Sequence, residues 1–418
     1  MDFFYQLQNF ILILYLCLSY IFVIAYIFFA NKQQEEDSTA YTGGISVLIP
    51  SYNEIHTIQS TIESVIKSKH DFNLEIIVID DGVESETCTL LRQKFPFKVC
   101  RCEYKKYIKT NTVKCIYYCK ICDVPVFLID KEHGCKADAL NTAINLAHYD
   151  YSLCLDADSF LDNNALTEMH KSIHTNTLAI GGKVQPYLAK EDRLLAKFLT
   201  IAQIYEYARI FNIVRVAYNN LHIVPLISGA ISLFHTQTVK TLGGYDRNTI
   251  GEDFELTLRL QNYAKDHGGE IQYCNSSIVY TQVPFDLVSI VKQRTRWYQG
   301  MVEVFKKYKN LFYTKSTFSV ALHFIRLYEQ YGFIFEIALA INYCKYLLII
   351  LSIEIIFNFA YTLYAQYKSN QKALINLFCL SIFGIAFHFL NTAIKLLYYF
   401  RKKRSSWEFC TRRPHETI

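Results

Sequence analysis

Charged residues are scarce in this sequence. They make up 19% of the 418 residues, whereas hydrophobic residues make up 51%. A typical soluble domain carries about 25% charged residues, so this fraction is low for a soluble domain, and the length is enough for one large domain plus membrane helices. The net charge of +5 is small and gives no indication of a nucleic-acid partner.

Two further features are missing. Residues 50–54, which follow the first expected strand, do not form a glycine-rich turn. This argues against a dinucleotide-dependent oxidoreductase. The 13 cysteines are an odd number, so they cannot all pair, and their pattern does not match a small secreted disulfide scaffold. We therefore expect reduced thiols, as in a cytoplasmic catalytic domain.

Three stretches are compatible with a membrane. No charge occurs between Asp2 and Lys32, and residues 10–29 are almost all apolar, which is long enough to cross a bilayer as a helix. Because this stretch lacks a basic start and a small-residue cleavage site, it predicts an uncleaved anchor rather than a signal peptide. The second stretch, residues 333–364, contains Glu336, Lys345 and Glu354, and the third, residues 373–394, contains no charge.

The basic cluster Arg401–Arg404 follows the third stretch directly. Basic residues beside a span favour the cytoplasmic side, so we expect an integral membrane protein with an external N-terminus and a cytoplasmic catalytic domain. The predicted segments are an N-terminal transmembrane anchor (1–32), a linker (33–44), the catalytic domain (45–310), an interfacial segment (311–332), two transmembrane helices (333–400) and a basic cytoplasmic tail (401–418).

Short apolar runs alternate with helical patterns from Ile45 onward. The runs predict strands at 45–49, 75–79, 126–129, 151–155, 178–180 and 230–234, and the patterns predict helices at 56–67, 137–147, 161–174 and 253–263. Such alternation predicts an α/β fold with a mostly parallel sheet, which binds ligands beyond the carboxyl ends of its strands. Two apolar segments with interspersed charges, 194–216 and 316–331, fit either a helix on the membrane surface or an ordinary domain helix.

Polar residues follow three of the expected strands. The first strand ends in the segment Pro50–Glu54, the second in Asp80-Asp81-Gly82 and the fourth in Asp156-Ala157-Asp158. These residues should meet at one edge of the sheet, where a nucleotide would lie. Asp156 and Asp158 face one side of the chain, and their hard oxygens suit Mg²⁺ or Mn²⁺ bound to a diphosphate. An Asp-x-Asp pair by itself is more often solvated turn chemistry.

Two expected helices begin with charged residues. Lys136 opens one, and a lysine at a helix N-terminus suits a phosphate, although an exposed lysine is the simpler interpretation. Glu252 and Asp253 open another after Gly251, either as simple dipole partners or as the base that deprotonates an attacking hydroxyl group.

A third helical stretch places an amide, a guanidinium and an indole on one face. Gln293, Arg296 and Trp297 stand at positions i, i+3 and i+4. Arginine grips phosphate with two donors, and tryptophan stacks on a sugar ring, so this face suits a sugar diphosphate. The alternative is an amphipathic helix with one buried Trp.

Taken in this order, the five motifs resemble those of processive family-2 glycosyltransferases with the GT-A fold, which make poly-N-acetylglucosamine, hyaluronan, chitin and cellulose. The resemblance covers roughly residues 45–300. For the donor, the resemblance implies that a UDP-sugar has its uridine surrounded by Pro50, Tyr52, Glu54 and Asp81 and its diphosphate near Lys136 and Asp156. It implies that Asp158 binds the metal together with Asp156 and that Asp253 is the base. It also implies that the acceptor and pyrophosphate site is lined by Ser228, Gly229, Glu252, Gln293, Arg296 and Trp297.

Three positions depart from the family pattern. Cys135 stands where a glycine usually precedes the lysine, Gly251 replaces a threonine, and Gly182-Lys183-Val184 replaces a glycine-asparagine pair. No catalytic group is lost, but the acceptor details differ.

The segment from 92 to 122 is basic and rich in cysteine. Cysteines at 100, 102, 115, 119 and 122 raise the possibility of zinc, but the spacing matches no common finger. A solvated insertion is the plain interpretation of its basic residues, and contact with anionic lipid headgroups is the functional one.

The resemblance predicts an inverting enzyme that transfers sugars from a UDP-sugar to a growing β-linked polysaccharide at the lipid bilayer and couples synthesis to export. A non-processive enzyme with a membrane lipid acceptor is the alternative. A transporter or scaffold with an inactive domain is disfavoured because Asp156, Asp158, Asp253 and Arg296 are all present. The sequence names neither the sugar nor accessory subunits nor the oligomeric state.

Overall fold

The computed structural model describes residues 2–31, 41–82, 86–187, 193–313, 317–327 and 377–401, with short pieces between 332 and 367. The chain divides into two compact units. The sheet unit comprises residues 36–189, 224–283 and 409–418, and the helical unit comprises residues 1–35, 190–223 and 284–408. The predicted domain from 45 to 310 therefore contributes residues to both units.

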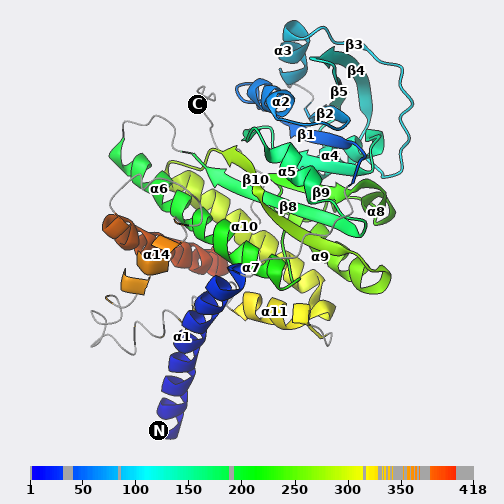
Figure 1. The fold of residues 1–418 in the computed structure, drawn as a ribbon. Coiled ribbons are helices and arrows are strands. Elements are labelled where there is room, and N and C mark those ends of the chain that lie inside the picture. Colours follow the sequence, from blue (N-terminus) through cyan, green and yellow to red (C-terminus); the bar gives the residue numbers. More distant parts are fainter. Residues whose placement is uncertain are drawn as a thin grey trace. The chain divides into compact units, whose positions relative to one another are not determined.

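The sheet unit is built on one sheet with the strand order β3-β4-β5-β2-β1-β6-β9-β8-β10-β7 (Figure 1). Its strands are β1 (Ile45–Ser51), β2 (Leu74–Asp80), β3 (Lys98–Val99), β4 (Val113–Ile121), β5 (Val124–Lys131), β6 (Tyr151–Leu155), β7 (Ser159–Leu161), β8 (Thr177–Pro186), β9 (Ile231–His235) and β10 (Glu270–Thr281). All six predicted strands are present. Strands β1 and β2 are buried over nearly their whole length, as their continuous apolar sequences require.

The expectation of a mostly parallel sheet is met only in part, because the sheet is mixed and β8 with β10 is its one parallel pair outside the centre among the described strands. Strands β5, β2, β1 and β6 are parallel, but β9 runs antiparallel between β6 and β8. The pair β4–β5 is also antiparallel, because Cys122 and Asp123 join the strands with positive φ angles of 49° and 66°. The basic segment 92–122 is therefore not a simple insertion, since β3 and β4 extend the sheet.

The helices of the sheet unit are α2 (Ile58–Lys67), α3 (Thr87–Lys94), α4 (Lys136–Leu146), α5 (Ala165–Lys171), α8 (Thr236–Thr241) and α9 (Glu252–His267). The four predicted helices are confirmed, although α5 begins four residues late because Ser159–Leu161 forms β7. Helix α4 packs on β1 and β2. It is buried from Ala137 to Leu146, which its alanines allow because small side chains let the helix lie close to the sheet.

The helical unit contains α1 (Asp2–Ala30), α6 (Leu194–Arg209), a π-helical turn (Ile210–Val214), α7 (Arg215–Asn220), α10 (Leu287–Lys307), a 3₁₀ turn (Lys309–Tyr313), α11 (Thr317–Ile325) and α14 (Leu377–Arg401). Two apolar clusters stabilise it. Ala30 packs with Ala208, Ile213, Ala217 and Tyr361, and Leu199 packs with Ala202, Ile290 and Phe387.

Helix α6 covers most of the ambiguous segment 194–216. Its Glu206 forms an ion pair with Arg294 of α10, and its Arg209 lies 5.6 Å from the ring centre of Tyr361. Both charges thus have partners within the helical unit, as in an ordinary domain helix.

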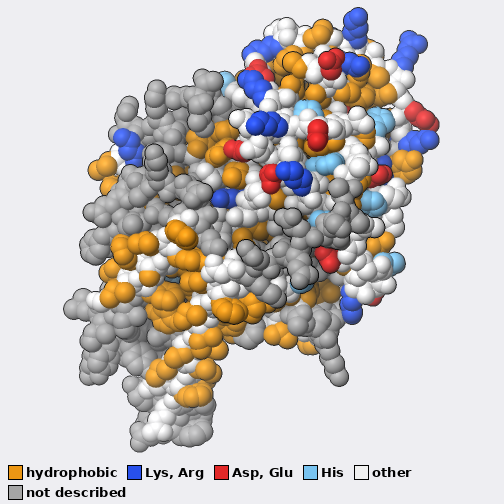
Figure 2. Space-filling model, in the orientation of Figure 1, with side chains coloured by type: hydrophobic (Ala, Val, Ile, Leu, Met, Phe, Trp, Pro, Cys, Tyr) orange, Lys and Arg blue, Asp and Glu red, His pale blue; other side chains and the backbone are white. Residues whose placement is uncertain are grey.

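The three predicted membrane spans are not confirmed. Among the described residues, none of the helices combines the length and the apolar character needed to cross a bilayer. The first stretch does form a helix, α1, whose large hydrophobic side chains at Phe10, Ile11, Ile13, Leu14, Ile21, Ile24 and Phe28 are exposed (Figure 2). Helix α14 covers most of the third stretch. Most of the second stretch, including Glu354, lies outside the described residues.

Candidate active site

The ends of β1 and β2 meet as their parallel pairing predicts. Ser51 pairs with Asp80 in the register of the two strands, and the Asp81 N–H donates to the Ser51 carbonyl over 2.9 Å. This bond places Asp81 beside Pro50 and Tyr52 at one edge of the sheet. Glu54 lies at the start of α2, where its carboxylate accepts a 3.2 Å hydrogen bond from Thr57.

A ring and a carboxylate line this edge. The Tyr52 ring lies 4.7 Å from the ring of His133, whose Nδ1 is 3.1 Å from Asp81 Oδ2. Asp81 also accepts from Lys131 Nζ at 2.5 Å and from the Gly134 N–H at 3.0 Å. Burial raises the pKa of Asp81, and the lysine only partly offsets this effect. An aromatic pair beside a fixed carboxylate suits a nucleobase, which stacks and offers N–H donors.

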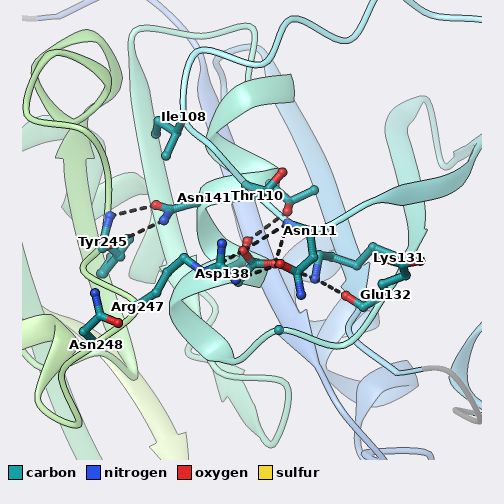
Figure 3. A network of polar contacts seen from close by, with 12 residues as sticks. Ile108, Thr110, Asn111, Lys131, Glu132, Asp138, Asn141, Tyr245, Arg247 and Asn248 are labelled. Atoms are coloured by element: carbon teal, nitrogen blue, oxygen red, sulfur yellow. Dashed lines mark hydrogen bonds and ion pairs between the residues drawn. The ribbon is translucent and has the colours of Figure 1, made fainter.

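Asp138 gathers three donors at the start of α4 (Figure 3). Lys131 Nζ lies 2.7 Å from Asp138 Oδ2, Arg247 Nε lies 3.0 Å from Oδ1, and the Asn111 N–H donates to Oδ1 over 3.2 Å. Lys131 is fully buried and touches both Asp81 and Asp138. This network therefore fixes the edge of the sheet at Asp81 relative to α4.

The turn before α9 is held to the same helix. Asn141 accepts from the Tyr245 N–H at 2.7 Å and donates to the Tyr245 carbonyl at 2.9 Å (Figure 3). Gly244 has φ of +77°, and a Cβ there would lie 2.2 Å from Asn141 Oδ1, so glycine is required. The Tyr245 hydroxyl lies 3.1 Å from Cys154 Sγ on β6. These contacts set the position of α9 relative to α4 and β6.

Lys136 lies among three acidic side chains. Its ammonium contacts the Asp156 carboxylate directly and lies 4.0 Å from Glu252 Oε1. Burial lowers the pKa of Lys136, but Asp156, Glu252 and Asp253 together raise it above its ordinary value. The side chain is therefore a permanent cation at neutral pH, and it is not the exposed helix-start lysine of the simpler interpretation.

Asp253 faces the turn formed by Ser228 and Gly229. The Gly229 N–H donates to Asp253 Oδ2 over 3.0 Å. A Cβ at Gly229 would lie 3.2 Å from Lys136 Nζ and 3.4 Å from Asp253 Oδ2, so this glycine lets the turn approach both groups. The Ser228 carbonyl accepts from the Ile231 N–H at 3.3 Å, which closes the turn ahead of β9. Lys136, Asp253 and the turn thus form one cluster.

Asp156 and Asp158 follow β6 as predicted. The Asp156 side chain is 30% exposed, while Asp158 is buried and accepts a 3.1 Å hydrogen bond from Ser159. In the described part of the chain, no three His, Cys, Asp or Glu residues form a group that could hold a metal by themselves. Two carboxylates still fit Mg²⁺ or Mn²⁺, because these ions commonly take their remaining ligands from a substrate diphosphate and water.

Gln293, Arg296 and Trp297 belong to the helical unit and lie in the single helix α10. Trp297 is 41% exposed, so the alternative of a fully buried tryptophan is wrong. The guanidinium of Arg294 covers its ring at 4.6 Å from the centre. A sugar that stacks on Trp297 would have to use the other face of the indole.

The loop before Lys136 tolerates its unusual residue. Cys135 has φ of 168°, an extended conformation that any residue adopts. The glycine that this loop requires is Gly134, since a Cβ there would lie 2.4 Å from Asp138 Oδ2.

The cysteine-rich segment forms no described metal group. Cys115 and Cys119 lie on β4, and both thiols are free, as are those of Cys100, Cys102 and Cys122. The described residues therefore offer no support for zinc here.

Sequence reasoning missed Lys131, His133, Asp138 and Arg247. The polar run from Lys131 to Gly134, between a buried strand and a helix, was the available signal for the first two. Asp138 lies within the motif that begins at Lys136. No local sequence pattern indicated a role for Arg247, because its partner Asp138 lies 109 positions earlier in the chain.

Comparisons with known proteins identify the family. The model of "Glycosyl transferase family group 2" matches residues 152–391, and that of "Glycosyl transferase family 2" matches residues 46–121. The chain is 30% identical over 306 residues to a poly-beta-1,6-N-acetyl-D-glucosamine synthase of Staphylococcus epidermidis, with 73% of this chain and 65% of that protein covered. A synthase of the same name from Staphylococcus aureus strain COL is 30% identical over 287 residues, with 69% and 61% covered.

The chain thus spans somewhat less than two thirds of the length of these relatives. Among solved structures, a mannosyltransferase from Pyrobaculum calidifontis in complex with GDP-Man and Mn²⁺ has a TM-score of 0.59 at 16% identity. The match covers 95% of this chain and 100% of that one and shows a shared fold.

Proposed function

Because the chain belongs to glycosyl transferase family 2, we propose that it transfers sugars from a UDP-sugar to a growing β-linked polysaccharide with inversion at the anomeric carbon. The observation that carries this proposal is the cluster of Lys136, Asp156 and Asp253 around the Gly229 turn. It brings an ammonium and a carboxylate together at one edge of the sheet, which supports a role for the first at the diphosphate and for the second at the acceptor.

Asp253 is the base in this proposal. Its carboxylate accepts the proton of the acceptor hydroxyl while that oxygen bonds to the anomeric carbon. The bond from the anomeric carbon to the diphosphate oxygen breaks, and UDP leaves with the electron pair. Attack from the face opposite the leaving group inverts the configuration. The Gly229 N–H donates to Oδ2 of Asp253, and the Phe254 N–H donates to Oδ1. In this proposal Oδ1 is the atom that accepts the proton.

The donor is held by the sheet edge. Tyr52, His133 and Asp81 surround the uracil, and Glu54 lies nearby at the start of α2. Lys136 exchanges part of its contact with Asp156 for the diphosphate. Asp156 and Asp158 would hold Mg²⁺ or Mn²⁺, which when bound neutralises charge on the departing diphosphate.

Chain growth depends on the helical unit in this proposal. Arg296 and Gln293 grip the pyrophosphate, and the exposed Trp297 receives the terminal sugar, with Glu252 and Ser228 on the acceptor side. Support for a polymer comes from the printed names of the relatives, which are polysaccharide synthases. The charge-free stretch before Lys32 and the exposed apolar side chains of α1 support a location at the membrane, with the catalytic domain cytoplasmic and product export coupled to synthesis.

The test is to incubate the purified full chain with a panel of UDP-sugars, Mg²⁺ or Mn²⁺, and membrane lipid. Release of UDP with long products supports the proposal. Products that carry one sugar on a lipid would replace it with the lipid-acceptor alternative. No turnover of any UDP-sugar would overturn it.

A further inference from the structure

Lys183 is a buried cation that the proposed reaction does not use. It lies on β8, and its residue is only 5% exposed. Within the described ranges its ammonium has no hydrogen bond or ion pair. A buried ammonium without a counter-charge is costly, which makes Lys183 a candidate to bind an anionic group of a substrate.

The sheet places Lys183 at the catalytic edge. Strand β9 is antiparallel to both β6 and β8, so β6 and β8 run in the same direction. Their carboxyl ends therefore lie at the same edge. Asp156 follows the end of β6, and Lys183 lies in the carboxyl-terminal half of β8.

Strand alternation also fixes the face. A Cβ at Gly181 would lie 3.2 Å from the side chain of Ile227, whose N–H donates to Thr257 of α9. Lys183, two residues on, points to the same face of the strand. That face carries the turn of Ser228 and Gly229, which follows Ile227 and contacts Asp253.

The position favours the sugar side of the site. Strand β8 is separated from β6 by β9, so it lies about 10 Å from β6, the strand that Asp156 follows. Lys136 already contacts Asp156 at the diphosphate position. A second ammonium two strands away is placed to meet either a group on the sugar or a diphosphate oxygen next to it.

We propose that Lys183 binds an anionic oxygen group of the substrate, either a sugar carboxylate or an oxygen of the donor diphosphate. This inference rests on the proposed function, because it takes the Ser228–Gly229 turn as part of the sugar site. If the contact is to a sugar carboxylate, the enzyme accepts an acidic sugar more readily than it would without Lys183.

Direct binding separates this inference from catalysis. Calorimetry on the purified full chain compares UDP, UDP-N-acetylglucosamine and UDP-glucuronic acid for the wild type, Lys183→Met and Lys183→Gln. Lys98→Met, which removes an exposed lysine on β3, is the matched control. Loss of a charged hydrogen bond should weaken binding on the order of tenfold to a hundredfold.

A loss confined to UDP-glucuronic acid assigns the contact to the sugar carboxylate. An equal loss for all three ligands assigns it to the diphosphate. If either folded variant binds all three ligands as the wild type does, the inference is overturned. An enzyme that turns over no UDP-sugar but shows the binding difference would refute the proposed function and leave Lys183 as an anion site.

Discussion

Lys131 and Asp138 form an ion pair in which both side chains are completely buried. Their Nζ and Oδ2 atoms are 2.7 Å apart, and Lys131 also contacts Asp81. The pair joins the end of β5 to the start of α4, so it ties the sheet edge at Asp81 to the helix that begins with Lys136. Ion pairs of this kind add little net stability when formed but cost much when one partner is removed.

Lys131→Met should therefore destabilise the protein strongly. It leaves Asp81 and Asp138 buried without their shared cation, and such losses cost about 3–5 kcal/mol. Lys114→Met is the matched control, since it removes a lysine from an ion pair with Asp130 in which both side chains are partly exposed. Exposed pairs are worth about 0–1 kcal/mol. Denaturant unfolding of the two variants measures the difference, and equal losses would refute the argument.

Asp253→Asn should keep UDP binding and lose sugar transfer. The amide preserves the shape of the group but cannot take the acceptor proton, and a positioned base contributes about 10²–10⁴ to the rate. Asp266→Asn, in the exposed last turn of the same helix, should act as the wild type. Near-normal turnover of Asp253→Asn would move the role of the base, first to Glu252, which Glu252→Gln would test.

Removal of divalent metal should abolish transfer. Excess chelator should stop UDP release, and added Mn²⁺ or Mg²⁺ should restore it, because the two carboxylates after β6 need the diphosphate to complete a metal site. Asp158→Ala should lose activity that added metal does not rescue. Full activity of that variant, or of the wild type in chelator, would contradict the prediction.

Trp297→Ala should shorten the polymer without weakening UDP binding. The exposed indole is the proposed platform for the terminal sugar, and each newly added unit presents the same face to it. Tyr313→Ala, which removes another exposed ring from the helical unit, is the control. Arg296→Ala should instead weaken UDP binding, because a charged phosphate contact is lost. Unchanged product length in a folded Trp297→Ala protein would move the acceptor site elsewhere.

Lys183→Met should raise thermal stability at neutral pH. Burial lowers the pKa of Lys183 to about 8 from its ordinary value of 10.5. The unfolded chain thus binds more protons between pH 8 and 10.5, so this lysine opposes folding below pH 8 and ceases to do so as pH rises through that window. The gain from Lys183→Met should shrink between pH 8 and pH 10.5 in melting experiments. A variant less stable than the wild type at pH 7 would be inconsistent with an uncompensated charge.

The sequence by itself determined the centre of the sheet and the order of the site residues. Continuous apolar runs specified β1, β2, β5 and β6, since strands buried on both faces need them. Polar residues at the ends of these strands then had to share one edge, which predicted where Asp81 and Asp156 lie.

The tertiary structure decided what local patterns do not encode. Strands β4 and β10 carry mixed polar residues, so their places followed from pairing with neighbours rather than from alternation. The pairing of Asp138 with Arg247 and the approach of Gly229 to Asp253 join segments far apart in the chain. Such contacts depend on packing between elements. The burial of Lys183 depends on the same packing: in the sequence this lysine is a departure from a motif, and in the structure it is a buried cation without a partner among the described residues.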